Sequence, residues 1–291
     1  MIVPHLQSKN DKDLRETKVR KGNQYFVIET RQPSPRNTMS KVIVVTGVSR
    51  GIGRAVVHEL MSNDSSAIVY GIARTESALK ELHKEYDGRF HYVVGDISDT
   101  AIQKKLVSQV IQEQGHCDSL IANAGVLEPV APVDEFDQEK WQTHFNINFF
   151  SVVSLVSQLL PYIERVNGNC IFVSSGASVK HYYGWSCYGA AKAALNSYAQ
   201  SLASEKPNIR SIAVAPGVVD TQMQVDIRER FGPKSMTPQA LKRFTDLQKN
   251  GQLLKPQVPA SVYAALAITG IPKDLNGLYV RYNDPRLNLD E

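Results

Sequence analysis

The apolar positions of this chain gather in short runs that are separated by longer amphipathic stretches. Seven runs have the length and composition of buried strands, at residues 42–45, 67–73, 90–95, 119–122, 171–173, 211–215 and 277–282. Buried parallel strands read as continuous apolar runs, and helical sequence between them supplies the crossover connections. The pattern therefore predicts an α/β fold, a single doubly wound domain with a parallel sheet of about seven strands.

The first 38 residues precede this pattern and differ from it in charge. They hold eight Lys/Arg and four Asp/Glu, an excess equal to the net charge of +4 of the 291-residue chain. A basic tail is compatible with contact to nucleic acid or membrane, but mixed charges and the lack of an aromatic stripe favour a disordered leader or extension. Met39 directly precedes the first predicted strand and is a candidate biological start. We therefore expect the folded domain at residues 39–291.

Composition narrows the class of protein further. The chain is 42% hydrophobic, and no apolar run approaches the length of a membrane span. Its start lacks the apolar core of a secretory signal. Cys117, Cys170 and Cys187 have no metal-binding spacing and suit a reducing compartment. We expect a cytoplasmic protein with no metal site and with neither nucleic acid nor membrane as a partner.

A glycine-rich turn follows the first predicted strand. It reads Thr46-Gly47-Val48-Ser49-Arg50-Gly51-Ile52-Gly53 and leads into a helical pattern. Glycines at such a turn let the backbone approach a pyrophosphate, which the free N–H groups of the helix N-terminus stabilise. The spacing differs from the G-x-G-x-x-G fingerprint, and the glycines alone would also suit tight bends. The position at the first strand–helix junction favours a nucleotide site.

The end of the second predicted strand bears on the choice of nucleotide. In NAD-preferring proteins an acidic residue here accepts the ribose hydroxyls, but this sequence has Arg74 and no carboxylate before Glu76. Arg74 and Arg50 are suited to flank a 2′-phosphate, because a planar guanidinium matches phosphate geometry. Two solvated surface arginines are the alternative. The missing carboxylate favours the phosphate, and hence NADPH/NADP+.

Further polar residues stand at or after strand ends. Asp96 and Ile97 follow the third strand, and Asn123-Ala124-Gly125 follows the fourth, where either a turn or a chain passing beneath a nucleotide would fit. Asn148 lies in the middle of a long apolar helix expected at 137–165. Such an amide either satisfies helix interactions or holds a water at a site.

The stretch from residue 170 to 192 carries the candidate chemistry. Ser175 stands just beyond a predicted strand, at the sheet edge where ligands bind in open α/β folds. Tyr188 and Lys192 are four apart in Ala-rich sequence, so a helix places phenol and ammonium on one face. At about 4 Å and an effective dielectric of about 20, the ammonium would stabilise a phenolate by roughly 4 kcal/mol and bring its pKa from about 10 towards 7. Such a phenol can exchange a proton with a carbonyl oxygen, although Tyr–Lys pairs at this spacing also recur by chance.

Residues 222–257 are more polar than the rest of the body and contain several Gly and Pro residues. They follow the run Pro216-Gly217-Val218-Val219-Asp220-Thr221 at the end of the sixth strand. We expect a partly helical insertion over the carboxyl edge of the sheet, which makes it a candidate substrate lid.

In combination these motifs resemble the short-chain dehydrogenase/reductase family, whose fold is of the Rossmann type. The resemblance covers residues 39–284 and rests on TGVSRGIG at 46–53, Asp96, NAG at 123–125, Asn148, Ser175, Tyr188-x-x-x-Lys192 and PGVVDT at 216–221. Ser175 precedes Tyr188 by thirteen residues, the usual spacing of the family. The resemblance implies that a nicotinamide cofactor is held by Thr46, Gly47, Ser49, Arg50, Gly51, Ile52, Gly53, Arg74, Asp96, Ile97, Asn123, Ala124, Gly125, Tyr188, Lys192, Pro216, Gly217, Val219 and Thr221.

The same resemblance implies a catalytic set of Asn148, Ser175, Tyr188 and Lys192. NADPH would deliver a hydride to a carbonyl carbon while Tyr188 donates the proton and Ser175 hydrogen-bonds the carbonyl oxygen. Lys192 would lower the pKa of Tyr188 and hold the ribose, and Asn148 would position a water. The loop residues Tyr182, Tyr183 and Trp185 are candidates for an aromatic substrate wall, with core packing as the alternative. Relatives pair through helices at about 137–165 and 186–205, which implies a homodimer.

Within the family the chain is most similar to the sepiapterin reductases and the benzil (1,2-diketone) reductases. The shared segments are PGVVDTQMQ, LKRFTDLQKNGQLLKP and NGLYVRYND. Sepiapterin reductases anchor the pterin with an aspartate in the final strand, where this chain has Arg281, so a charge-assisted pairing is lost. The resemblance therefore favours an NADPH-dependent reductase of a vicinal diketone such as benzil over a pterin ketone reductase. A non-catalytic NADPH-binding sensor is the alternative from another class, and the complete catalytic set argues against it.

Overall fold

The computed structural model describes residues 14–21, 24–31 and 40–287 and divides the chain into two units, Met1–Ser40 and Lys41–Glu291. The larger unit is built on a sheet of seven strands in the order β5-β4-β3-β6-β7-β8-β9, with every neighbouring pair parallel. The strands are β3 (Val42–Thr46), β4 (Ile68–Ala73), β5 (Phe90–Val94), β6 (Ser119–Ala122), β7 (Asn169–Val173), β8 (Arg210–Ala215) and β9 (Tyr279–Arg281). The doubly wound Rossmann-type domain is confirmed, and its strand order reverses between β3 and β6.

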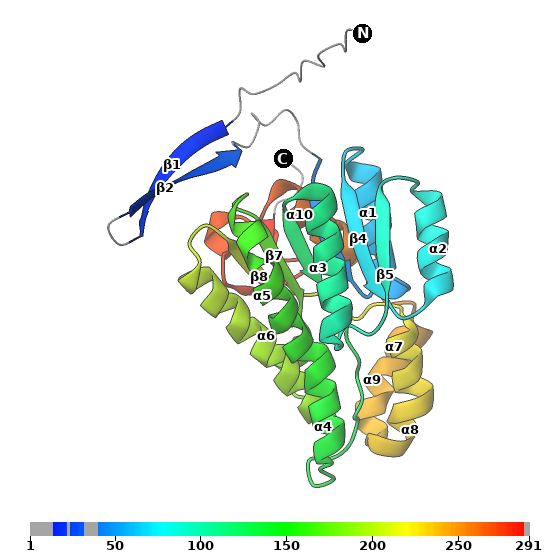
Figure 1. Ribbon diagram of the computed structural model, residues 1–291. Helices are drawn as coiled ribbons and strands as arrows, with labels where there is room; N and C mark the ends of the chain where they lie inside the picture. Colours follow the sequence, from blue (N-terminus) through cyan, green and yellow to red (C-terminus); the bar gives the residue numbers. More distant parts are fainter. Residues whose placement is uncertain (1–13, 22–23, 32–39, 288–291) are drawn as a thin grey trace, which may run out of the picture. The chain divides into compact units, whose positions relative to one another are not determined.

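Helices cover both faces of this sheet (Figure 1). One face packs on α1 (Gly51–Asn63), α2 (Glu76–Glu85) and α10 (Gln257–Thr269), and the other on α3 (Thr100–Gln114), α5 (Ser151–Glu164) and α6 (Ser186–Glu205). Successive residues of a strand point to opposite faces, so Ile43 and Val45 join the first core while Val42 and Val44 join the second. The continuous apolar runs of the sequence follow from burial on both sides.

The long apolar helix expected at 137–165 is interrupted in the middle. It consists of α4 (Gln138–Phe145), a π-helical turn η1 (Asn146–Phe150) and α5. By length and composition Gln138–Glu164 would suffice to cross a membrane, but Leu155 and Leu159 are buried in the core beside the sheet. Asn148 lies within the π-helical turn and is fully buried.

Residues 222–257 form the partly helical insertion that the sequence suggests. Its pieces are α7 (Gln222–Val225), the π-helical η3 (Asp226–Phe231), α8 (Gly232–Ser235) and α9 (Pro238–Lys249). Ile227, Met236 and Phe244 of this insertion pack with Trp185 and Tyr188 in a third apolar cluster. The insertion therefore packs directly against the stretch that carries the candidate chemistry.

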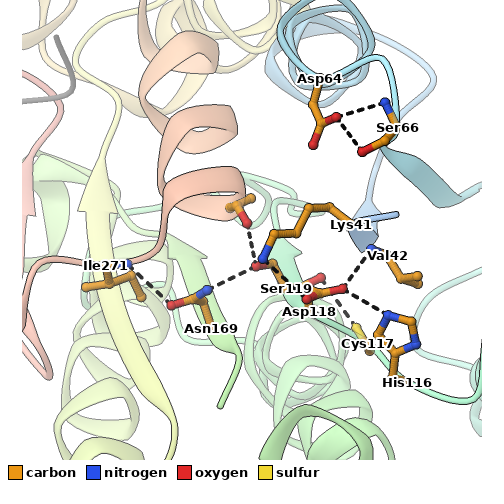
Figure 2. A network of polar contacts seen from close by, with 11 residues as sticks. Lys41, Val42, Asp64, Ser66, His116, Cys117, Asp118, Ser119, Asn169 and Ile271 are labelled. Atoms are coloured by element: carbon orange, nitrogen blue, oxygen red, sulfur yellow. Dashed lines mark hydrogen bonds and ion pairs between the residues drawn. The ribbon is translucent and has the colours of Figure 1, made fainter. Parts of the chain in front are cut away.

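The amino ends of the central strands are connected by polar contacts (Figure 2). The Asp118 carboxylate accepts a hydrogen bond from the Val42 amide at 2.9 Å and pairs with Lys41 at 3.4 Å and His116 at 3.2 Å. Burial works to raise the pKa of Asp118, but the contacts with His116, Val42 and Lys41 outweigh it and lower that pKa. These contacts stabilise the end of the sheet away from the candidate site.

The smaller unit differs from the expectation of a disordered leader at 1–38. Strands β1 (Leu14–Lys21) and β2 (Gln24–Arg31) pair as an antiparallel hairpin, and the rest of that leader lies outside the described residues. The overlooked signal is Gly22-Asn23 between two runs with β-branched and aromatic residues, a dipeptide that favours two-residue hairpin turns. A two-stranded hairpin alone is only marginally stable in water, so its dispensability stays a prediction.

Candidate active site

A cavity of about 300 Å³ opens at the carboxyl ends of the sheet strands. Most of the site residues expected from the sequence line it: Gly47, Ser49, Arg50, Gly51, Ile52, Arg74, Asp96, Ile97, Asn123, Ala124, Gly125, Ser175, Tyr188, Lys192, Pro216, Gly217, Val219 and Thr221. Thr46, Gly53 and Asn148 are absent from its wall. They are buried behind the wall and contact residues that do line the cavity.

Thr46 and Gly53 hold the floor of the cavity together. Thr46 Oγ1 accepts hydrogen bonds from the amides of Asn123 at 3.0 Å and Ala124 at 2.9 Å, which joins the ends of β3 and β6. Gly47 adopts a φ of +74°, and a Cβ on Gly53 would stand 2.2 Å from the Gly47 carbonyl oxygen. A side chain at Gly53 would therefore force the turn apart.

The N-terminus of α1 faces this cavity through Gly51 and Ile52. The N-cap residue Arg50 is extended and makes no side-chain capping bond, and the first turn of α1 has no acidic residue. Helix N-termini present backbone N–H groups and a positive dipole end to anions. The turn therefore fits the pyrophosphate of a nicotinamide dinucleotide.

Arg74 lies at the end of β4, as the sequence indicated, but it has an acidic neighbour. Its Nη1 lies 3.8 Å from Oδ2 of Asp96 at the end of β5, and both side chains are substantially exposed. Burial works to raise the pKa of Asp96, while Ser98 and Arg74 lower it more strongly. The carboxylate of Glu76 is paired with Lys80 at 2.9 Å. Asp96 is the only acidic residue among the described residues that line the cavity.

Ser175 begins the short 3-10 turn after β7 in an extended conformation. Its Oγ accepts a hydrogen bond from the Ala177 amide at 3.1 Å, which leaves its own O–H available as a donor. Asn196 supports this turn from α6, because its Nδ2 donates to Ser178 Oγ at 2.9 Å and Ser178 Oγ donates to the Ser175 carbonyl at 2.6 Å.

Tyr188 and Lys192 share one face of α6 and are both buried. The Lys192 Nζ donates to the Val173 carbonyl at 2.7 Å and lies 5.8 Å from the centroid of the Tyr188 ring. The expectation that the pKa of Tyr188 falls towards 7 is wrong here: burial raises that pKa, and a hydrogen bond with Ser175 opposes the rise without reversing it. Burial also lowers the pKa of Lys192 to about 8. Desolvation thus outweighs the attraction between phenolate and ammonium.

Asn148 and His144 form a polar pair behind the catalytic face. Asn148 Oδ1 accepts from the Val126 amide and Nδ2 donates to the Val126 carbonyl, each at 2.8 Å. Nδ2 also lies 2.6 Å from His144 Nε2, while His144 Nδ1 contacts the Glu128 carbonyl. Since Nδ1 donates to that carbonyl, Nε2 is the acceptor of the neutral ring. The amide of Asn148 thereby fixes the loop after β6, and its water-positioning role stays a prediction.

Burial and the nearby positive charge of Lys192 lower the pKa of His144 to about 4, against the smaller opposing effect of the Glu128 carbonyl. The imidazole is therefore neutral at neutral pH and stacks edge-on to the Tyr188 ring, with centroids 6.0 Å apart. His144 is not among the site residues predicted from the sequence. Its spacing of four residues from Asn148 was the available signal.

Aromatic side chains form one wall of the cavity. Tyr182 and Trp185 stack with ring centroids 4.9 Å apart, and Trp185 stacks on Phe244 of α9 at 5.2 Å. Tyr183, the third candidate for this wall, is 46% exposed and lies outside this cavity. Sequence reasoning also missed Met223, Gln224, Arg243 and Phe244, because nothing local shows which side chains of the 222–257 insertion face the cavity.

The family model described as short chain dehydrogenase matches residues 41–231. The chain belongs to the short-chain dehydrogenase/reductase family. It is therefore an oxidoreductase that binds a nicotinamide cofactor and acts on small-molecule substrates.

Similar proteins and solved structures from Saccharomyces cerevisiae cover nearly all of the larger unit. An uncharacterized oxidoreductase, YIR035C, is 53% identical over 249 residues, 86% of this chain and 98% of the relative. Its crystal structure matches with a TM-score of 0.85 over the same shares. The benzil reductase ((S)-benzoin forming) IRC24 is 52% identical over 258 residues, which cover 86% of this chain and 98% of the relative. The crystal structure of a cytoplasmic protein with unknown function matches with 51% identity and a TM-score of 0.74, over 85% of this chain and 98% of that one.

Proposed function

We propose that this protein is an NADPH-dependent carbonyl reductase whose substrates are vicinal diketones such as benzil. The observation that carries the proposal is the meeting of Ser175, Tyr188 and Lys192 in a cavity walled by Tyr182, Trp185 and Phe244. Stacked aromatic walls suit a substrate with aryl groups. The similarity to a benzil reductase over 98% of that relative supports the same substrate class.

NADPH is the proposed cofactor because of the charges at the end of β4. Arg74 and Arg50 line the cavity there, and the nearest carboxylate in sequence, Glu76, is occupied by Lys80. Asp96 competes for Arg74, but a phosphate dianion carries more charge than a carboxylate and accepts a planar guanidinium equally well. These charges support a 2′-phosphate that contacts Arg74 and Arg50.

In the proposed reduction a reduced nicotinamide, when bound, supplies the hydride, and the side chains of this protein supply the proton and stabilise the developing charges. Tyr188 donates its phenolic proton to the carbonyl oxygen, and its raised pKa keeps that proton in place at neutral pH. The Ser175 hydroxyl donates to the same oxygen, which becomes more negative during the reaction. Lys192, charged below a pKa of about 8, stabilises the phenolate left behind.

The pterin ketone alternative has less support from the cavity. Arg281 at the end of β9 lines it, where a carboxylate would be needed to pair with the amino-pyrimidine edge of a pterin. The non-catalytic sensor stays the alternative from another class.

A cytoplasmic homodimer is proposed for the enzyme as a whole. The localisation is supported by the solved relative described as cytoplasmic. Dimerisation is supported by aromatic side chains on the helical segment 138–164, where Phe150 is 54% exposed and its ring centroid lies 5.5 Å from that of Phe149.

A spectrophotometric screen tests the function. Oxidation of NADPH at 340 nm is followed with benzil, other vicinal diketones, quinones and sepiapterin. We expect the highest kcat/KM with an aryl vicinal diketone. Preference for sepiapterin would favour the pterin alternative, and NADPH binding without turnover of any carbonyl would favour the sensor.

A further inference from the structure

In addition to the arginines proposed to contact the 2′-phosphate, three cationic side chains line the cavity that also contains Ser175 and Tyr188. Besides the buried Lys192, these are Arg243 of α9 and Arg281 at the end of β9. The Nη1 of Arg281 lies 3.9 Å from the position that a Cβ would take on Gly176, the residue after Ser175. The guanidinium of Arg243 lies over the Tyr182 ring, 5.4 Å from its centroid. Arg281 thus lies beside the turn that carries Ser175, and Arg243 lies beside the aromatic wall of the same cavity.

Among the residues that the structure describes, neither arginine has a carboxylate partner. Surface cations such as Arg230 and Lys242, in contrast, form ion pairs with acidic side chains. The one acidic side chain of the cavity wall, Asp96, follows β5 at one edge of the sheet, whereas Arg281 ends β9 at the opposite edge. Trp185 adds a buried indole N–H without an acceptor. Among the described residues, this end of the cavity therefore offers donors and two arginines without a paired carboxylate, and the acceptor nearest in kind is the buried, unpartnered Oε1 of Gln224, which also lines the cavity.

From this arrangement we propose that the site takes 2-oxo acids with an aromatic side chain, in which a carboxylate replaces the second ketone of a diketone. The inference rests on the proposed function, because it assigns a substrate class to the same site. A guanidinium donates to a carboxylate through two parallel N–H bonds, a match that a neutral ketone cannot make as strongly. Arg281 and Arg243 hold the carboxylate, and the rings of Tyr182, Trp185 and Phe244 receive the aryl group.

The chemical step is the same as for a diketone. Hydride adds to the 2-carbon, the carbon–oxygen π bond breaks, and Tyr188 supplies the proton for the new hydroxyl. The nicotinamide is oxidised by two electrons, the ketone is reduced by two, and the carboxylate is unchanged. Phenylglyoxylate would thus give mandelate.

Two substrates of nearly equal shape test the inference: phenylglyoxylate and 1-phenyl-1,2-propanedione, which differ by a carboxylate oxygen against a methyl group. We expect wild-type enzyme to reduce the acid with a kcat/KM at least equal to that of the dione. In Arg281→Met the ratio of kcat/KM for acid over dione should fall about tenfold, mainly through the KM of the acid, as expected for the loss of a charged hydrogen bond. Arg243→Met should lower the same ratio. Arg286→Met, which removes an arginine paired with Asp284 at 2.7 Å and outside the cavity, is the matched control and should leave the ratio unchanged.

Binding provides a second readout that needs no turnover. Calorimetric titration of the NADP+-saturated protein should show mandelate binding about tenfold weaker in Arg281→Met than in wild type, with a smaller change for neutral 1-phenyl-1,2-ethanediol. If the dione is reduced but the acid is neither reduced nor its product bound, the inference is overturned and the proposed function stands. An unchanged acid-to-dione ratio in both arginine variants would also overturn it. If no carbonyl is reduced, the proposed function fails. In that case the binding experiment alone tests the carboxylate site: weaker mandelate binding in Arg281→Met supports it, and unchanged binding overturns it.

Discussion

Tyr188 carries a proton that the buried environment retains, since desolvation raises the pKa of its phenol. That direction suits a proton donor in the reductive reaction better than the lowered pKa expected from Lys192 alone. In the proposed reduction, the ammonium of Lys192 contributes mainly after the proton has left, when the phenolate needs a counter-charge.

Tyr188→Phe keeps the ring and its packing against Trp185 but removes the proposed donor. We expect kcat for diketone reduction to fall by about 10²–10⁴, with little change in NADPH affinity. Steady-state kinetics and fluorescence titration of NADPH measure the two quantities. Tyr183→Phe, an exposed tyrosine outside the cavity, is the control. A Tyr188→Phe enzyme that folds, binds NADPH and turns over at the wild-type rate would refute the assignment.

His144 couples acid stability to the active site, because its pKa is lowered from 6.5 to about 4 in the fold. Between these values the unfolded chain takes up a proton that the folded chain does not, so stability falls as pH falls from 6.5 towards 4. From pH 7 to pH 5 this single group costs about 2 kcal/mol. In His144→Gln the loss over the same interval should be smaller by that amount, whatever the variant's stability at pH 7. Urea unfolding of both proteins at the two pH values measures the difference, and equal losses would contradict it.

At the level of the strands, we expect the side chains at the carboxyl ends of β4 and β5 to decide between NADPH and NADH. Arg74→Ala removes one proposed phosphate contact and frees Asp96 from its cation. We expect KM for NADPH to rise roughly ten- to hundredfold and KM for NADH to change much less. Arg54→Ala, which removes an arginine of α1 paired with Glu81 outside the cavity, should leave both values unchanged. An equal wild-type kcat/KM with NADH and NADPH would rule out a contact between Arg74 and the 2′-phosphate.

At the scale of the whole molecule, the larger unit contains the sheet, the helices and every residue of the cavity. A chain that begins at Met39 should therefore keep the Tm and the kcat/KM of the full chain. Differential scanning calorimetry and the reductase assay compare the two. Failure of the shorter chain to fold would show that residues 1–38 contribute to stability.

The proposed homodimer depends on the aromatic residues of the helical segment 138–164. Phe150→Glu places a charge on an exposed ring position and should weaken association, because a charge buried in an apolar interface loses its hydration. Sedimentation equilibrium should show dimers for wild type and monomers for the variant at micromolar concentration. Val258→Glu, an equally apolar exposed position on α10, is the control. A monomeric wild-type protein would contradict the proposal.

The pattern of apolar runs was enough to predict the sheet and the position of the site along it. Each of the seven apolar runs is a strand, with boundaries that differ by at most two residues, because burial on both faces demands continuous apolar sequence. Residues after these strands, such as Arg74, Asn123 and Ser175, meet at one edge because parallel strands all end there. The parallel direction of the strands was therefore enough to predict that these residues lie together, before any side-chain contact was known.

The interactions among those residues depend on contacts between elements that are distant in the sequence. Arg281 reaches the turn after Ser175 from a strand more than a hundred residues later, and His144 joins Asn148 through a π-helical turn that no local propensity announces. The pKa of Tyr188 depends on how completely distant segments exclude water, which outweighs a neighbour four residues away. Spacing along the chain specifies which groups can be near each other, whereas burial and the packing of distant elements set their charge and their partners.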